Sequence, residues 1–155
     1  QMCIRDRYDG GREKAPAALC RKIILAKENG EKKIDVWGDG EQTRSFMYID
    51  DCIIGTKKLF NSEYSGSINI GSDEQVSINQ MIDIISEIAN YKIDKNYQLD
   101  KPKGVRGRSS NNDLIREKTN WDITYTLKQG LEKTYKWIYD QLKSKSNTNK
   151  FTKSY

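Results

Sequence analysis

Histidine is absent from this 155-residue chain, and proline and cysteine are scarce, with two and three residues. Without histidine the chain has no Ser-His-Asp or Cys-His nucleophile system and lacks the commonest zinc ligand. Cys3, Cys20 and Cys52 are irregularly spaced and form no CxxC pair, so we expect free thiols and no metal site. The chain also contains no GxGxxG loop, which removes the usual dinucleotide-binding fingerprint.

Long apolar runs are missing as well. No stretch of the sequence has the roughly 20 apolar residues of a membrane-spanning helix, and no signal-peptide pattern opens the chain. We therefore expect a cytoplasmic protein without a membrane partner.

What the chain does contain is typical of a globular domain. Hydrophobic residues make up 35% and charged residues 32%, and the net charge is +5. A basic surface attracts a phosphorylated small molecule or a nucleic acid, although most surface lysines are simply solvated.

Local signals alternate between helix and strand, which predicts the α/β class. Helices are expected at 16–29, 51–60, 78–89, 112–118 and 127–142, and strands at 34–37, 42–48, 67–70 and within 91–99. The first two strands flank a Gly-Asp-Gly turn at 38–40, which predicts a hairpin. Capping boxes are expected at 77–80 and 126–129, and two further helix starts at Asp50 or Asp51 and at Asn111 or Asn112.

Three polar segments beside turns are candidates for chemistry. In 10–16, Lys14 lies at a helix start, where anions bind and an ammonium transfers protons, unless Glu13 and Lys14 are simply an exposed pair. In 37–46, Arg44 follows a turn and suits a phosphate, unless it is an ordinary surface arginine of the hairpin.

The third segment, 103–111, contains Arg106 and Arg108 separated by one glycine. Two guanidinium groups at this spacing suit a diphosphate. An arginine-glycine pair also suits RNA, but the pair occurs once and without interleaved aromatic residues.

Four strings carry a resemblance to a known family. They are GGREKAPAA at 10–18, WGDGEQTRSF at 37–46, NIGSDE at 69–74 and GVRGR at 104–108. In this order they resemble the GDP-mannose 3,5-epimerases, which are NAD-dependent extended short-chain dehydrogenases. The resemblance implies the C-terminal, substrate-binding part of that fold, an incomplete Rossmann-type fold, over residues 9–144. Residues 1–8 depart from the family and are expected to be a non-native leader, and 145–155 a polar tail.

The resemblance also implies roles for individual residues. Lys14 matches the acid/base lysine of the family. Substrate-contacting positions are matched by Glu13, Ala15, Lys22, Gln42, Thr43, Arg44 and Arg108. No cysteine of this chain matches the catalytic cysteine of the family, and no residue here matches its NAD site or its Tyr-x-x-x-Lys pair.

The reaction implied is the epimerisation of GDP-mannose at C3 and C5. NAD removes hydride from C4, the neighbouring protons become acidic and exchange, and hydride then returns. The implied partners are GDP-mannose or a related nucleotide sugar, NAD held outside this segment, and a second copy of the parent enzyme, with no nucleic acid.

Two alternatives remain at this point. One is another NAD-dependent nucleotide-sugar 4-epimerase, dehydratase or decarboxylase, in which Lys14 would have no acid/base task. The other is a non-catalytic basic module that binds nucleic acid through Arg106 and Arg108.

The absence of a dinucleotide fingerprint yields a first prediction. We expect the purified 155-residue chain to show no epimerase turnover with GDP-mannose and NAD, because it has no site to hold NAD. Chromatographic detection of the epimerised sugar nucleotides checks this, and turnover by the chain alone would contradict it.

Overall fold

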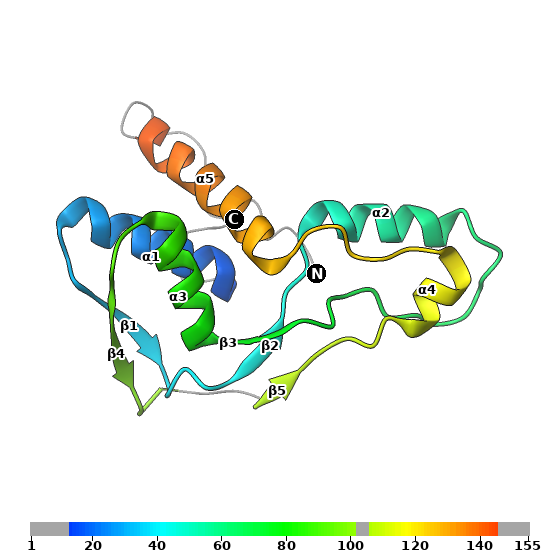
Figure 1. Ribbon diagram of the computed structural model, residues 1–155, viewed down its shortest axis with the longest axis horizontal. Coiled ribbons are helices and arrows are strands. Elements are labelled where there is room, and N and C mark those ends of the chain that lie inside the picture. The colour runs from blue at the N-terminus through cyan, green and yellow to red at the C-terminus, as the bar shows by residue number, and fades with distance from the viewer. Residues whose placement is uncertain (1–12, 102–105, 146–155) are drawn as a thin grey trace, which may run out of the picture.

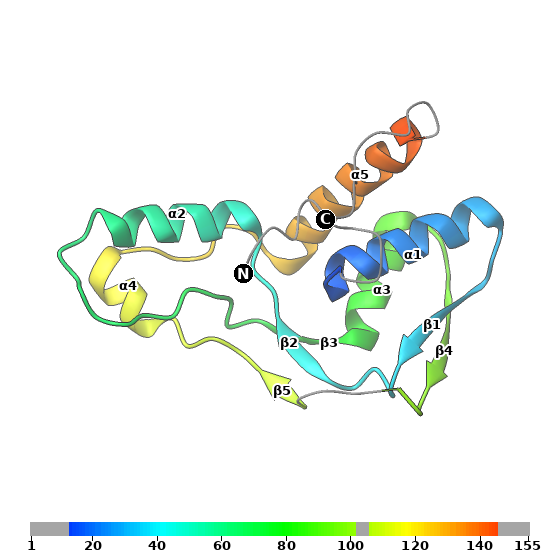
Figure 2. The same ribbon diagram turned by 180° about the vertical axis from the view of Figure 1, so that it is seen from behind.

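The computed structural model describes residues 13–101 and 106–145. Its elements are α1 (Ala15–Asn29), β1 (Lys33–Trp37), β2 (Thr43–Ser45), α2 (Ile49–Phe60), β3 (Gln75–Ser77), α3 (Ile78–Ala89), β4 (Asp94–Gln98), β5 (Gly107–Arg108), α4 (Asp113–Thr119) and α5 (Leu127–Lys145). Helices α1, α3 and α5 gather at one end of the molecule and α2 and α4 at the other, with β2, β3 and β5 between them (Figures 1 and 2). The predicted α/β class is confirmed.

The strands form two small sheets. β1 pairs in parallel with β4, from Lys33 opposite Asp94 to Trp37 opposite Gln98. β2 lies between β3, which is antiparallel to it, and β5, which is parallel to it. Each sheet joins segments that are far apart in the sequence.

The predicted hairpin is therefore wrong. β1 and β2 flank the expected turn but belong to different sheets. Gly38 and Gly40 both adopt positive φ, 76° and 73°, so the chain turns within three residues and leaves the first sheet. Local spacing shows a turn between two extended segments, but it does not show that β1 finds its partner 61 residues later in β4.

Strand prediction fails at three other places. Within the described residues, segment 67–70 is not a strand, because no other segment pairs with it. β3 and β5 were not predicted, since three and two residues are too short to show alternation. Pairing with β2, rather than local pattern, makes them strands.

Helix ends follow the sequence signals more closely. α1 has its proline in the first turn and ends at Gly30, whose φ of 71° is left-handed. The Glu31 amide then donates to the Ala26 carbonyl at 2.8 Å. Both predicted capping boxes are present: Ser77 and Gln80 exchange bonds of 3.1 and 2.8 Å, and the corresponding pair at 126–129 exchanges bonds of 3.3 and 2.9 Å.

Two of the predicted N-cap residues, Asp51 and Asn112, use their side chains for contacts outside the helix start. α2 is preceded by Tyr48, so Asp50 and Asp51 lie inside its first turn and cap nothing. Asn112 occupies the cap position of α4, but its side chain donates to the Gly71 carbonyl at 2.9 Å, and the other predicted residue, Asn111, accepts the amide of Asp113 at the start of the helix at 3.0 Å. The side chains of Asp51 and Asn112 bond to residues far away in the sequence, which local sequence does not reveal.

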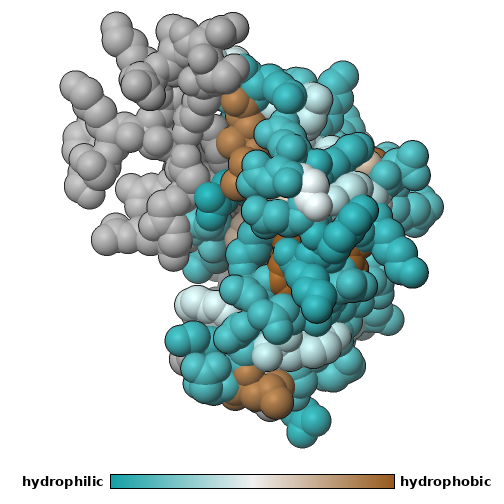
Figure 3. All heavy atoms as spheres, turned by 90° about the vertical axis from the view of Figure 1, so that its left-hand side faces the viewer, coloured by the Kyte–Doolittle hydropathy of each residue, from teal (hydrophilic) through white to brown (hydrophobic). Residues whose placement is uncertain are grey.

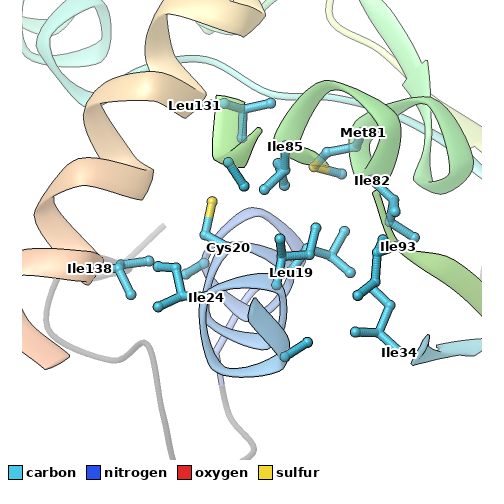
Figure 4. Packing of buried hydrophobic residues seen from close by; sticks show 14 of the residues in the cluster. Leu19, Cys20, Ile24, Ile34, Met81, Ile82, Ile85, Ile93, Leu131 and Ile138 are labelled. Carbon is cyan, nitrogen blue, oxygen red and sulfur yellow. The ribbon is translucent and has the colours of Figure 1, made fainter. Parts of the chain in front are cut away.

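The main core lies between α1, α3 and α5 (Figure 4). The predicted apolar stripe of α3 is confirmed, with Met81, Ile82 and Ile85 fully buried. They face Leu19 and Cys20 of α1 (Figure 4). From α5, Leu127, Leu131 and Ile138 complete the same cluster.

Cys20 behaves as a core residue. Its side chain is fully buried, and this burial raises the pKa of its thiol to about 12. Because the thiolate is the reactive form, the structure makes Cys20 an inert packing residue.

A smaller packed region joins α2 to α4 around Trp121 and Ile115, both buried. Gly55 of α2 lies against the indole: a Cβ there would be 2.9 Å from Cε2 of Trp121. This glycine allows the helix and the indole to approach closely.

The opposite end of the molecule, around α1, β1 and β4, presents a mostly hydrophilic face with small separate apolar areas (Figure 3). No helix within the described ranges has the length and apolar character needed to cross a membrane.

Core packing yields a second prediction. Ile85→Ala removes a fully buried side chain facing α1, and we expect a loss of about 2–5 kcal/mol in the free energy of unfolding. Ile53→Ala, at a residue 57% exposed on α2, is the control and should change it by less than about 0.5 kcal/mol. Urea unfolding followed by circular dichroism measures both, and equal losses would contradict the assignment of the core.

The raised pKa of Cys20 yields a third prediction. At pH 8 its thiol stays protonated and shielded, so we expect the folded chain to leave Cys20 unmodified by iodoacetamide while the partly buried Cys52 reacts faster. Peptide mass spectrometry after timed labelling separates the two sites. In denaturant both should react at similar rates, and labelling of Cys20 at the rate of Cys52 in the folded chain would contradict the prediction.

Candidate functional site

The start of α1 holds the first group of predicted site residues. Lys14 occupies the N-cap position with extended backbone, its carbonyl accepts the Ala18 amide at 2.9 Å, and its side chain is exposed. Ala15 opens the helix and packs against the main core, as does Phe46 just after β2. The helix start and the end of β2 therefore rest on the same core.

Glu13 and Arg21 form a partly buried ion pair beside Lys14. Arg21 donates to the Glu13 carboxylate at 2.7 Å, and the Glu13 side chain is only 5% exposed. The alternative that Glu13 and Lys14 are both simply exposed therefore holds for the Lys14 side chain and fails for the Glu13 side chain.

Lys22 lies on α1 about two turns after its first residue, Ala15. Its ammonium group donates to the backbone carbonyl of Asp35 in β1 at 2.9 Å. In this structure the lysine fastens α1 to β1, so a ligand at Lys22 would have to share or replace that bond.

The ladder between β2 and β5 brings together the second and third predicted segments. The Thr43 amide donates to the Arg106 carbonyl at 2.9 Å, and Arg44 stands opposite Arg108 in the parallel register. Residues opposite each other in neighbouring strands, roughly 4.8 Å apart, direct their side chains to the same face. Two guanidinium groups therefore share one face of this sheet, an arrangement that suits a diphosphate.

Neighbouring bonds hold β2 in place, and the bond of the Thr43 hydroxyl lies on the opposite face from Arg44, because successive residues of a strand alternate. The Thr43 hydroxyl donates to the Gln75 side chain at 3.1 Å, and Arg44 donates to the Thr43 carbonyl at 2.6 Å. Gln42 donates from its amide to the Trp37 carbonyl at 3.2 Å, while its buried Oε1 accepts no bond within the described part of the chain. Gln42 thus retains one acceptor beside the basic pair.

Two hollows, of about 360 and 260 Å³, lie elsewhere. The first lies along β3 and the start of α3, and the second beside Arg116 and Tyr125. Neither is lined by a predicted site residue.

The sequence signals missed the long-range contacts of two residues, Asp51 and Asn79. Asp51 is fully buried, and its carboxylate accepts the amides of Thr124 and Tyr125 at 3.1 and 3.0 Å. Asn79 in the first turn of α3 bonds to the Gly-Asp-Gly turn that leads into β2. A helical position occupied by Asp or Asn gives no local sign of such contacts.

The residues described here do not fit a dinucleotide. No glycine-rich turn connects a strand to a helix N-terminus among them, and the basic sheet face lacks the cradle of backbone N–H groups that holds a pyrophosphate in the dinucleotide-binding fold. The basic groups on this face are side chains.

Comparison with known proteins agrees with the predicted resemblance. A sequence model of the family described as GDP-mannose 4,6 dehydratase matches residues 8–134. GDP-mannose 3,5-epimerase 1 of Oryza sativa subsp. indica is 46% identical over 135 residues, and GDP-mannose 3,5-epimerase of Arabidopsis thaliana is 44% identical. The alignments cover 87% of this chain and 34% of each relative, so the chain spans about a third of their length.

Solved structures show the same relationship at the level of the fold. UDP-glucose 4-epimerase of Thermotoga maritima superposes with a TM-score of 0.79 at 24% identity, over 89% of this chain and 43% of that one. UDP-glucuronic acid 4-epimerase of Bacillus cereus, in complex with UDP-glucuronic acid and NAD, has a TM-score of 0.70 at 30% identity, over 86% and 43%. With its α/β fold and collinear sequence, the chain belongs to the NAD-dependent epimerase/dehydratase family of nucleotide-sugar enzymes and is homologous, over part of their length, to the GDP-mannose 3,5-epimerases.

Proposed function

We propose that this chain is the nucleotide-sugar-binding part of an enzyme that epimerises GDP-mannose at C3 and C5. The observation that carries the proposal is the β2–β5 register, which places Arg44 and Arg108 on one sheet face. Their planar guanidinium groups each offer paired N–H donors that match the oxygens of a diphosphate.

Lys14 is the proposed proton carrier. It is an exposed ammonium group at the start of α1, with Glu13 held beside it by Arg21. In the proposal its ammonium group donates a proton to one face of a ring carbon made acidic by the neighbouring 4-keto group, while the catalytic cysteine of the family, which no residue of this chain matches, removes the proton from the opposite face. Glu13, Ala15 and Lys22 line the sugar side, and Gln42 and Thr43 join Arg44 on the strand side.

NAD supplies the hydride chemistry that produces this keto group in the family. Because the described residues do not fit a dinucleotide, the proposal places NAD on another part of the polypeptide. It likewise treats pairing with a second copy as a property of the parent enzyme.

Other nucleotide sugars are the nearest alternative. The similarity to UDP-glucuronic acid 4-epimerase at 30% identity favours a nucleotide-sugar ligand without choosing the base. The 46% identity to a protein named GDP-mannose 3,5-epimerase supports guanosine and mannose.

A binding experiment tests the proposal. We expect the 155-residue chain to bind GDP-mannose more tightly than UDP-glucuronic acid in isothermal titration calorimetry. Arg108→Gln should weaken binding by about 10- to 100-fold, since bonds from a charged donor contribute ~1.5–3 kcal/mol.

The control is Lys33→Gln, an exposed position on β1 in the other sheet, which should leave the affinity unchanged. Absence of GDP-mannose binding by the unaltered chain, together with strongly salt-dependent RNA binding, would replace the proposal by the basic-module alternative. Equal affinity for both sugar nucleotides would leave the superfamily but remove the assignment to GDP-mannose.

A further inference from the structure

Asn79, the second residue of α3, is bonded through its backbone amide and through both the nitrogen and the oxygen of its side chain. Its backbone amide donates to the Gly40 carbonyl at 3.0 Å, and its Nδ2 donates to the Asp39 carbonyl at 3.1 Å and to the Glu41 carboxylate at 2.6 Å. Its Oδ1 accepts the Tyr97 hydroxyl of β4 at 3.1 Å. The amide thus has donors toward the turn and its acceptor toward β4, which satisfies all these groups with one orientation.

The turn and Asn79 also fit closely. Gly40 has a φ of 73°, and a Cβ placed on it would lie 2.6 Å from Cγ of Asn79. Within the turn the Glu41 amide donates to the Asp39 carboxylate at 3.1 Å. The backbone at 39–41 is therefore fixed by the bond between Glu41 and Asp39 within the turn and by the bonds from Asn79.

The start of α3 also bonds to Gln42, the residue that follows the turn. The Ile78 amide donates to the Gln42 carbonyl at 3.3 Å, and Thr43 then begins β2 with its bond to Arg106. β2 has only three residues, so its own ladder offers few bonds to fix its position. The start of α3 supplies the missing constraint just before the strand begins.

We propose that Asn79 is a positioning residue that fixes the turn at 38–41 and thereby sets the position of Gln42, Thr43 and Arg44, with Arg44 opposite Arg108. The effect of Asn79 on ligand binding rests on the proposed function, because Asn79 acts on the nucleotide-sugar site through the strand and does not itself contact the ligand. Its structural readout, the integrity of the β2–β5 ladder, does not depend on that function.

The experiment compares Asn79→Ala with Gln80→Ala. Both change the first turn of α3, but Gln80 serves the capping box, bonding to Ser77, and has no bond to the turn. We expect Asn79→Ala to speed hydrogen exchange of the Thr43 amide by at least about tenfold at a temperature where the chain stays folded, and to weaken GDP-mannose binding about fivefold or more, as for the loss of one or two hydrogen bonds. Gln80→Ala should lower the melting temperature while leaving GDP-mannose affinity unchanged.

A rescue variant separates positioning from general destabilisation. Asn79→Asp places a carboxylate against the Glu41 carboxylate and removes both donors, so it should resemble Asn79→Ala. Adding Glu41→Gln supplies a donor from the turn side, and we expect the double variant to recover part of the Thr43 protection. Tyr97→Phe, which removes only the bond to Oδ1, is the milder variant for use if Asn79→Ala unfolds, and should shift Thr43 exchange in the same direction by a smaller factor.

Two results overturn the inference. One is equal Thr43 exchange and equal affinity in Asn79→Ala and Gln80→Ala; the other is no recovery in the double variant. If the unaltered chain binds no GDP-mannose, the proposed function fails, and Thr43 exchange alone then decides whether Asn79 positions the strand.

Discussion

The burial of α1 between α3 and α5 is the constraint on which the rest of the described structure depends. Ile23 and Ile24 are fully buried in α1, and Met81, Ile82 and Ile85 meet that helix from α3. At roughly 1.5–3 kcal/mol for each large apolar side chain removed from water, this cluster is the principal source of stability at this end of the molecule. The short strands depend on it, because a two-stranded sheet has too little apolar contact to be stable alone.

Polar contacts fix the parts of the described chain that lie outside the main core. Asp51 joins the first turn of α2 to the segment that leads into α5, through the amides of Thr124 and Tyr125. Arg116 of α4 bonds to Asp73 and Asp122, and the bond from this guanidinium group keeps the pKa of Asp122 below its usual value. These contacts tie the end of the molecule that contains α2 and α4 to the segments on either side of it, where apolar packing is limited to the region around Trp121.

The candidate site is held in place both by the apolar core and by polar contacts. Its helix start rests on the core through Ala15, and its strand residues are held by β5 and by the start of α3. Two 4-epimerases share the fold of this chain, with TM-scores of 0.79 and 0.70. A site composed of one helix start and two short strands explains why its residues are spread over almost a hundred positions of the sequence.

The sequence by itself determined the α/β class, the ends of α1, both capping boxes and the apolar stripe of α3, because each depends on residues within one or two turns of one another. It also identified the family, through four collinear strings. Only the tertiary structure decided that β1 pairs with β4, that Arg44 stands opposite Arg108, and that Asp51 and Asn79 bind distant backbone. A strand of two or three residues has no period of its own, and a polar side chain gives no local sign of which distant group it will meet.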